Sequence, residues 1–286
     1  MNIFSSWIFY LIAYLILYVI FTQEYKVATK SMVHSGSLTL LLETIGACSA
    51  LLLIPLFKIQ FPTDIRVYIF LSLSIVFYTI NDRLGTIVRE GIEASTYSII
   101  SQLSTVFMVV AGLLFFKEKF LWYRVLGTII ILISNVLVFY EKGSFKPNKY
   151  VLFGILANLC LACALFIDVN LCENFNLAFY VMISLGLPGF LIKLVERIKI
   201  KEVKDEFIKG DKKSIILTGI TWCLVIITNL RMYQLGEVTV VAPLSSLTVI
   251  LNVIAGYCFY GEKNHLLKKI LASIFISIGV ILINCF

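Results

Sequence analysis

Polar and ionisable side chains interrupt an apolar segment of the sequence at "YTINDRLG" (78–85). Asn81, Asp82 and Arg83 are adjacent there, and Tyr78 lies four residues before Asp82, on the same face of a helix. The apolar run is long enough to cross a bilayer, where a charged side chain costs about 2.5–3.5 kcal/mol even on a lenient scale. A carboxyl group there can carry a proton or bind an amine, and a guanidinium can bind an anion. These four residues are therefore candidates for substrate binding.

Later apolar segments hold further candidates of the same kind, which are Asp168, Trp222, Asn229 and Arg231. One hypothesis has Arg83 or Arg231 binding an anionic group of a substrate. In the same hypothesis Asp82 or Asp168 carries a coupling proton or binds an amine. The alternative pairs Asp82 with one of the two arginines in an internal salt bridge. Trp222 could stack on a ring or a cation, or simply be a core aromatic residue.

Hydroxyl and amide side chains form two stripes at helical spacing. The first stripe consists of Ser98, Ser101, Gln102 and Thr105, and the second consists of Ser245, Thr248 and Asn252. Lipid would disfavour such faces, so they should point toward a cavity or hydrogen-bond to neighbouring helices. The stripe residues that we expect to bind substrate are Ser98, Gln102, Ser245 and Asn252.

The elements that must position these residues are membrane-spanning helices. The chain has 286 residues, of which 60% are hydrophobic and 14% charged, whereas a soluble domain has roughly 25% charged residues. Each apolar run approaches the roughly 20 residues that a transmembrane helix needs. The ten predicted spans are 3–22, 36–57, 67–88, 94–116, 121–140, 150–168, 177–195, 214–234, 238–260 and 265–285. The sequence thus predicts an all-α polytopic membrane protein with no room for a soluble catalytic domain.

Several kinds of function are not supported by the sequence. Cys160 and Cys163 have C-x-x-C spacing but lie within a predicted span without histidines or a second cysteine pair, so no metal is expected. No nucleophile–base pair and no nucleotide-binding loop is present, so we expect neither an enzyme nor a cofactor. The basic segment 193–213 is interleaved with acids, which argues against nucleic acid and favours contact with anionic lipid headgroups.

An internal repeat relates the two halves of the chain. The segment "EASTYSIISQLSTVFMVVAGLLFFKEK" (93–119) aligns without gaps with "EVTVVAPLSSLTVILNVIAGYCFYGEK" (237–263). Glu24 and Asp168 have the same separation of 144 residues. The predicted domains are a first repeat (1–140), a linker (141–149) and a second repeat (150–286). Five spans are an odd number, so the second repeat must enter the bilayer from the opposite side, as in many secondary transporters.

Three residues near the ends of the repeated segments are candidates for gating or for a family motif, namely Glu118, Pro243 and Glu262. Pro243 lacks an N–H group and lies inside the ninth span, where it should kink the helix. Glu118 and Glu262 stand in tight turns before the next helix, where the helix dipole favours an anion.

This pattern of an apolar helix, a Gly-Glu-like turn and a second apolar helix in each repeat resembles the EamA group of the drug/metabolite transporter superfamily. In the second half the motif positions are Pro243, Gly261, Glu262 and Gly279; in the first half only Glu118 and Gly127 fit well. Ile99 and Lys117 stand where the family often has proline and glycine. The resemblance implies transport of small metabolites or amphipathic compounds through a central cavity.

We therefore expect a secondary transporter that moves a small organic metabolite or amphipathic compound by alternating access, in a cell membrane of prokaryotic type. The expected partners are the substrate, the lipid bilayer, a coupling proton or sodium ion, and a second copy in a homodimer. A membrane-embedded enzyme and a structural helical bundle are the alternatives. The orientation stays open, because positive-inside counting places both termini outside, whereas the resembled family usually has them in the cytoplasm.

Overall fold

The computed structural model describes residues 6–115, 121–141, 144–145, 148–261 and 266–284, and these residues are almost entirely helical. The first half contains α1 (Trp7–Lys30), α2 (Ser35–Leu53), the 3-10 turn η2 (Ile54–Leu56), α3 (Ile65–Gly91), α4 (Ala94–Ile100), α5 (Gln102–Leu114) and α6 (Trp122–Phe139). Two antiparallel strands of two residues each, β1 (Tyr140–Glu141) and β2 (Ser144–Phe145), precede the second half. The second half contains α7 (Lys149–Leu171), η3 (Cys172–Asn174), α8 (Leu177–Glu196), α9 (Ile200–Lys209), α10 (Lys212–Leu235), α11 (Val238–Ser245), α12 (Leu247–Tyr260) and α13 (Leu266–Asn284).

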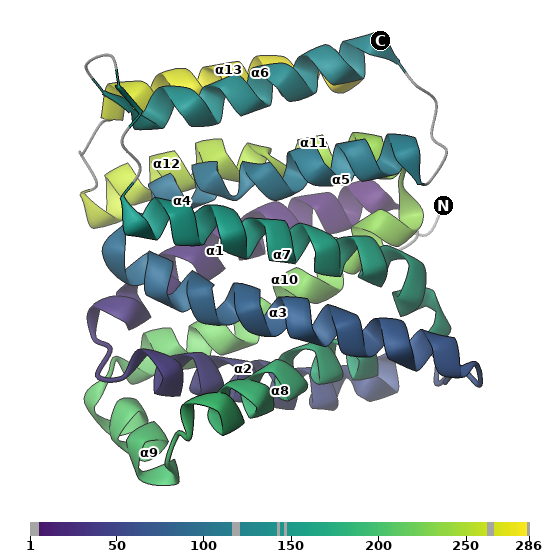
Figure 1. Cartoon of the computed structure of the whole chain (residues 1–286), viewed down its shortest axis with the longest axis vertical. Helices are drawn as coiled ribbons and strands as arrows, with labels where there is room; N and C mark the ends of the chain where they lie inside the picture. Colours follow the sequence, from purple (N-terminus) through teal and green to yellow (C-terminus); the bar gives the residue numbers. More distant parts are fainter. Residues whose placement is uncertain (1–5, 116–120, 142–143, 146–147, 262–265, 285–286) are drawn as a thin grey trace.

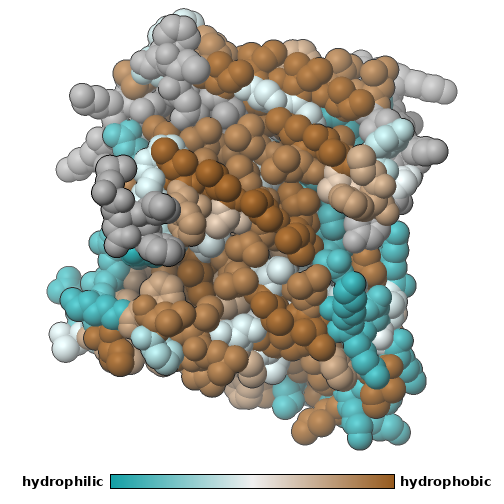
Figure 2. All heavy atoms as spheres, turned by 180° about the vertical axis from the view of Figure 1, so that it is seen from behind, coloured by the Kyte–Doolittle hydropathy of each residue, from teal (hydrophilic) through white to brown (hydrophobic). Residues whose placement is uncertain are grey.

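The predicted helical membrane fold is confirmed. Among the described residues, eight helical stretches are long and apolar enough to cross a bilayer. Apolar side chains fill the middle of the face seen in Figure 2, and polar side chains gather toward the edges where the helices end. This distribution is the one that a hydrocarbon layer selects.

Helix starts coincide with short polar side chains that cap them. Asn148, Asn176 and Asp211 accept hydrogen bonds from the backbone N–H three residues later, at 2.9, 3.0 and 3.1 Å. Each cap satisfies one of the N–H groups that a helix start leaves without an intrahelical partner. These local signals explain why α7, α8 and α10 begin where they do.

The helices pack in pairs that follow the sequence repeat. The most extensive pairs are α1 with α10, α3 with α7, α2 with α8, and α6 with α13. At the repeat separation of 144 positions, α1 corresponds to α7 and α3 to α10. The α1–α10 pair is therefore the counterpart of the α3–α7 pair. The other two pairs, α2–α8 and α6–α13, each join a helix to its own counterpart. In Figure 1 the bundle extends from α6 and α13 at one end to α2 and α8 at the other, with α9 beside the latter.

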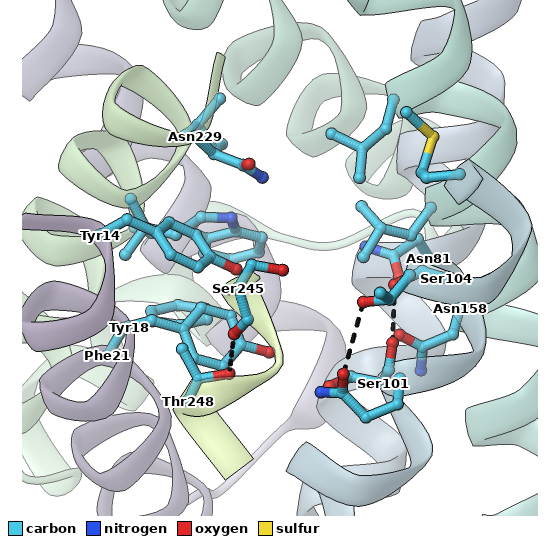
Figure 3. Close-up of a pocket in the computed structure, with 18 of the residues that line it drawn as sticks. Tyr14, Tyr18, Phe21, Asn81, Ser101, Ser104, Asn158, Asn229, Ser245 and Thr248 are labelled. Atoms are coloured by element: carbon cyan, nitrogen blue, oxygen red, sulfur yellow. Dashed lines mark hydrogen bonds between the residues drawn. The ribbon is translucent and has the colours of Figure 1, made fainter. Parts of the chain in front are cut away.

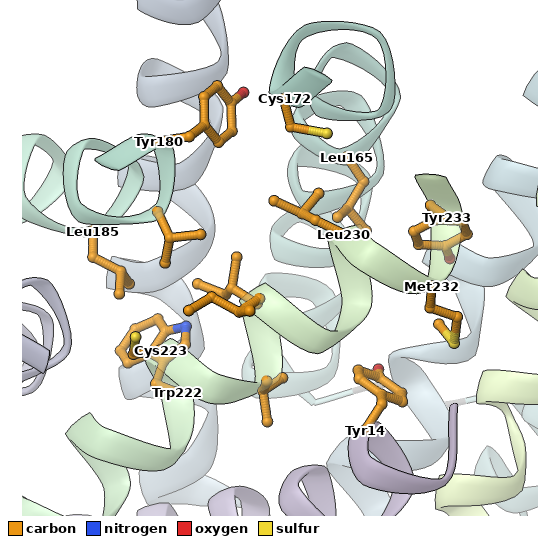
Figure 4. Close-up of a cluster of buried hydrophobic side chains, with 14 of the residues drawn as sticks. Tyr14, Leu165, Cys172, Tyr180, Leu185, Trp222, Cys223, Leu230, Met232 and Tyr233 are labelled. Atoms are coloured by element: carbon orange, nitrogen blue, oxygen red, sulfur yellow. The ribbon is translucent and has the colours of Figure 1, made fainter. Parts of the chain in front are cut away.

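The main hydrophobic core is built around α10. Figure 4 shows Trp222, Leu230 and Tyr233 of this helix with Tyr14 of α1 and Leu165 of α7. A helix that is apolar on nearly all sides is expected at the centre of a bundle. Helix α10 therefore fixes the relative positions of helices from both halves.

The fourth and ninth predicted spans are each interrupted, at Ser101 and at Ser246. Near both breaks a hydroxyl group bonds back to the carbonyl three residues earlier: Ser101 to Ser98 at 2.7 Å, and Ser245 to Ala242 at 2.6 Å. Such bonds compete with the helical ladder. The backbone of Pro243 lies within α11, but the first repeat is interrupted without a proline, so the shared hydroxyl groups account for what the two breaks have in common.

Candidate functional site

A cavity of about 100 Å³ lies between the two halves of the molecule. It is lined by Tyr14, Tyr18, Phe21, Tyr78, Asn81, Asp82, Arg89, Tyr97, Ser101, Gln102, Ser104, Thr105, Met108, Asn158, Leu161, Leu165, Trp222, Val225, Ile226, Asn229, Leu230, Tyr233, Ser245 and Thr248. Figure 3 shows Tyr14, Tyr18 and Phe21 facing Ser101, Ser104 and Asn158 across the hollow. The expectation that the polar stripes face a cavity thus agrees with the position of Ser101, Gln102, Thr105, Ser245 and Thr248.

The lining follows the internal repeat residue by residue. Eight pairs of lining residues are separated by the same 144 positions as the two repeats: Tyr14 and Asn158, Phe21 and Leu165, Tyr78 and Trp222, Asn81 and Val225, Asp82 and Ile226, Arg89 and Tyr233, Ser101 and Ser245, and Ser104 and Thr248. Equivalent surfaces of the two repeats therefore meet at the cavity.

The two walls of the cavity differ in polarity. Helix α3 contributes Asn81, Asp82 and Arg89, whereas the equivalent positions on α10 hold Val225, Ile226 and Tyr233. The α3 wall thus offers charge and hydrogen bonds, whereas the α10 wall is mainly aliphatic and aromatic, with Asn229 as its polar lining residue. Such a combination suits a small amphipathic molecule.

Several lining side chains have a buried polar atom with no hydrogen-bond partner among the described residues. They are Asn81, Asp82, Arg89, Asn158 and Asn229. Buried polar atoms are normally paired, and groups of exceptions mark places where a ligand or water completes the pairing. The cavity is therefore the candidate binding site.

Arg89 contributes a positive charge to the cavity lining, and the sequence analysis did not select it. Its guanidinium lies 3.7 Å from the ring centroid of Tyr97 and 4.3 Å from that of Tyr25. Aromatic faces stabilise the positive charge without using the N–H groups, which stay available for an anion. The signal for Arg89 was its position seven residues after Asp82, two helical turns along the same face.

The two arginines that the sequence singled out lie elsewhere. Arg83 pairs with Glu196 and donates to the Ser35 hydroxyl at 2.9 Å. Arg231 donates to Gln234 at 2.9 Å and lies over the Tyr10 ring. In the described part of the chain neither arginine forms the expected salt bridge with Asp82, which instead accepts a hydrogen bond from Asn81 at 2.7 Å.

The remaining predicted site residues divide into three groups. Tyr78, Asn81, Asp82, Gln102, Trp222, Asn229 and Ser245 line the cavity. Ser98, Asp168 and Asn252 are buried outside the lining. Asn252 joins the halves, because its carbonyl oxygens accept hydrogen bonds from Gln23 of α1 at 3.1 and 3.2 Å. Glu118 and Glu262 lie outside the described residues.

Asp168 is held by hydroxyl groups and does not face the cavity. It accepts hydrogen bonds from Ser74, Tyr78 and Tyr180 at 2.6, 2.6 and 2.5 Å. Its counterpart in the first repeat, Glu24, accepts a hydrogen bond from Ser214 of α10 at 2.7 Å. Asp168 of α7 thus bonds to α3, and Glu24 of α1 bonds to α10, which is the counterpart of α3 in the other repeat.

Comparisons with known proteins agree with this architecture. The sequence model of the EamA-like transporter family matches residues 148–285. In total, 28 chains of solved structures match the fold. One of them, from a crystal structure, covers 96% of this chain and 96% of its own, with 16% sequence identity and a TM-score of 0.66. No curated protein sequence matches the chain.

Proposed function

Because the second half of the chain matches the sequence model of the EamA-like transporter family, we propose that this multi-pass membrane protein is a secondary transporter of a small organic solute. The observation that carries the proposal is the cavity lined by equivalent residues of both repeats. Alternating access requires two similar halves that rock about a central site. An enzyme or a scaffold has no such requirement.

The proposed topology is ten crossings in two inverted repeats. Its support is the pattern of helix pairs. When each helix is replaced by its counterpart in the other repeat, the α1–α10 pair becomes the α7–α3 pair. The α2–α8 and α6–α13 pairs each consist of two counterparts and stay the same. With five crossings in each repeat, the two helices of each counterpart pair, such as α2 and α8, run antiparallel. The symmetry axis that relates the repeats then lies in the membrane plane. The proposed location is a prokaryotic plasma membrane.

The size of the cavity supports a closed conformation within the proposed transport cycle. A water molecule takes up about 30 Å³, so about 100 Å³ admits only a few waters, while small-molecule sites usually have about 300 Å³ or more. We infer that the conformation is closed. Substrate enters when the α3 and α10 walls move apart.

The chemistry of the walls supports one class of substrate, a small amphipathic molecule with an anionic group. An anionic group would bind at Arg89, and an apolar or aromatic body would lie against Trp222 and Tyr14. This assignment replaces the hypothesis that Arg83 or Arg231 binds the anion.

A panel of small organic acids, amines and neutral metabolites, screened for thermal stabilisation of the purified protein, tests the proposal. A compound at a hundredfold its Kd should add about 2.7 kcal/mol to the free energy of unfolding. The stabilising compound should then cross the membrane of proteoliposomes that contain the protein and not that of empty liposomes. Stabilisation by no compound, or equal flux into both, would contradict a transport function.

A further inference from the structure

Glu43, near the middle of α2, is a buried acid that the sequence analysis did not assign to the site. Its side chain is 0% exposed, and neither carboxyl oxygen has a hydrogen-bond donor in the described part of the chain. Gly189 of α8 packs against it, and a Cβ atom at that glycine would lie 2.5 Å from Glu43 Oε2. The carboxyl group is thus enclosed on its α8 side by backbone.

On its other side Glu43 meets Asp82 of α3. Helices α2 and α3 pack together, and the two carboxyl groups interact directly across this contact. Asp82 is only 3% exposed. Two ionised carboxylates have no hydrogen to share and repel each other strongly in a medium of low dielectric constant. A single proton converts the repulsion into a hydrogen bond, as it does in carboxylate pairs at enzyme active sites.

The surrounding groups do not remove the need for this proton. Tyr25 of α1 bonds to Thr86 at 2.6 Å, and Tyr78 of α3 donates to Asp168 at 2.6 Å. The Asn81 amide donates a hydrogen bond to the Oδ1 atom of Asp82, and the Oδ2 atom has no donor among the described residues.

The charged groups nearby form no ion pair with either of these carboxyl groups among the described residues. The Arg89 guanidinium stacks on Tyr97, and no ion pair between it and either carboxyl group occurs among the described residues. On α8, Glu196 pairs with Arg83, beside Gly36, about two turns along α2 from Glu43. On α7, Asp168 is occupied by three hydroxyl groups.

We propose that Glu43 and Asp82 share one proton, and that this proton holds the cavity closed. Asp82 lines the cavity and Glu43 lies behind it. When the cavity opens, water hydrates Asp82, both carboxyl groups ionise, and the proton leaves to water. If the protein transports as proposed above, this exchange makes the proton its coupling ion, so the coupling role rests on the proposed function while the shared proton does not.

Infrared spectroscopy of the purified protein tests the shared proton without any substrate. The wild-type protein should show a carboxylic C=O band at neutral pH that shifts in D₂O and disappears in alkaline buffer. Glu43→Gln and Asp82→Asn should each abolish the band, because the new amide donates a hydrogen bond and lets the remaining carboxyl group ionise. Glu24→Gln, the same change on a half-buried acid that already has the Ser214 donor, should keep it. Absence of the band from the wild type, or its survival in both amide variants, overturns the shared proton.

Cysteine labelling tests the link to closure. Ser245→Cys, in a variant lacking the seven native cysteines, places a thiol in the cavity lining. A water-soluble thiol reagent should label it several-fold more slowly near neutral pH than the same cysteine in a Glu43→Gln background, and the difference should vanish in alkaline buffer. A ratio that does not change with pH overturns the role in closure. Failure of every compound to cross proteoliposomes would contradict transport alone, since neither experiment here uses a substrate.

Discussion

Single residues set the chemistry of the cavity through the partners they have. Arg89 and Arg83 lie on the same helix, six residues apart, yet one faces aromatic rings at the cavity and the other pairs with Glu196. The aromatic contacts stabilise a guanidinium by about 0.5–2 kcal/mol without competing for its N–H groups. The charge at Arg89 is therefore available to a ligand, whereas the charge at Arg83 is already neutralised.

Arg89→Gln should weaken the binding of anionic compounds. Loss of one partner of a buried charge pair costs about 2 kcal/mol or more, which is about thirtyfold in Kd. The measurement is the concentration of an anionic compound from the panel that gives half-maximal thermal stabilisation. Arg83→Gln is the matched control and should leave this concentration unchanged. Equal weakening by both substitutions would show that long-range charge, and not contact in the cavity, governs binding.

Asp168→Asn should lower the stability of the fold. The carboxylate accepts three hydroxyl hydrogen bonds, and an amide oxygen replaces only part of this acceptor capacity. We expect a loss of about 2–4 kcal/mol, measured by thermal unfolding in detergent. Glu173→Gln, a similar change on an exposed acid of η3, should have little effect. Unchanged stability of the Asp168 variant would mean that the three hydroxyl groups find other acceptors.

At the scale of elements, two contacts between helices depend on single residues, a glycine in one and a glutamate in the other. Helices α6 and α13 cross at Gly127 and Gly279, and a Cβ atom at Gly279 would lie 2.7 Å from the Gly127 carbonyl oxygen. Helix α9 is attached to the start of α2 by Glu206, whose carboxylate accepts from the backbone N–H groups of Val33 at 3.0 Å and His34 at 2.6 Å.

Gly279→Ala should therefore destabilise the α6–α13 pair. Backbone cannot move aside as a flexible side chain can, and overpacking of this kind costs about 1–3 kcal/mol. Gly186→Ala is the control, because its new Cβ atom would meet only the Ala47 Cβ atom at 3.5 Å, an ordinary contact. The two variants are compared by their thermal unfolding temperatures. Similar values would contradict a close crossing at Gly279.

Glu206 should make stability depend on pH in a definite direction. Burial raises the pKa of Glu206, and the hydrogen bonds from His34 and Val33 offset this only in part. The folded protein then holds the proton more tightly than the unfolded chain. Stability should fall as pH rises from the ordinary glutamate value of 4.5 through the folded-state pKa. Glu206→Gln should flatten this part of the stability profile, while Glu202→Gln on the same helix should not. A slope that persists in the Glu206 variant would assign it to other groups.

At the scale of the whole molecule, the proposed repeats form matching helix pairs but carry different side chains at the cavity. Equivalent lining positions carry Asp82 and Arg89 in one repeat, and Ile226 and Tyr233 in the other. A duplicated scaffold can keep its packing symmetric while one wall acquires charge, because packing needs only shape at the helix contacts. The charged side chains of the lining, Asp82 and Arg89, therefore both come from α3 of the first half.

Equivalent loops of inverted repeats should face opposite sides of the membrane. Lys58 follows η2, and Glu202 of α9 lies 144 positions later. Single cysteines at these two positions, in a variant without native cysteines, should react with a membrane-impermeant maleimide from opposite faces of oriented vesicles. Labelling of both from the same face would require repeats related by an axis along the membrane normal.

The membrane fold and the repeat were predictable from the sequence because they depend on composition and order along the chain. Apolar runs of bilayer length must be helical in lipid, since every backbone polar group needs an internal partner. The constant separation of Glu93 from Glu237 and of Glu24 from Asp168 likewise needs no three-dimensional information. Asp82 and the serine stripes could be singled out because a polar group in an apolar run is costly wherever it points.

Only the tertiary structure decided which of these polar groups meet. Arg83 and Arg89 are equally basic in the sequence, and the packing of α3 against α1, α4 and α8 gave one to the cavity and the other to Glu196. The sequence predicts Asp168 as a site residue, but in the structure it accepts hydrogen bonds from Tyr180 and two residues of α3. Glu43 gained its importance from Asp82 on a different helix. Sequence spacing determines which side chains share a helix face, whereas the partner that each face meets depends on how separate helices pack together.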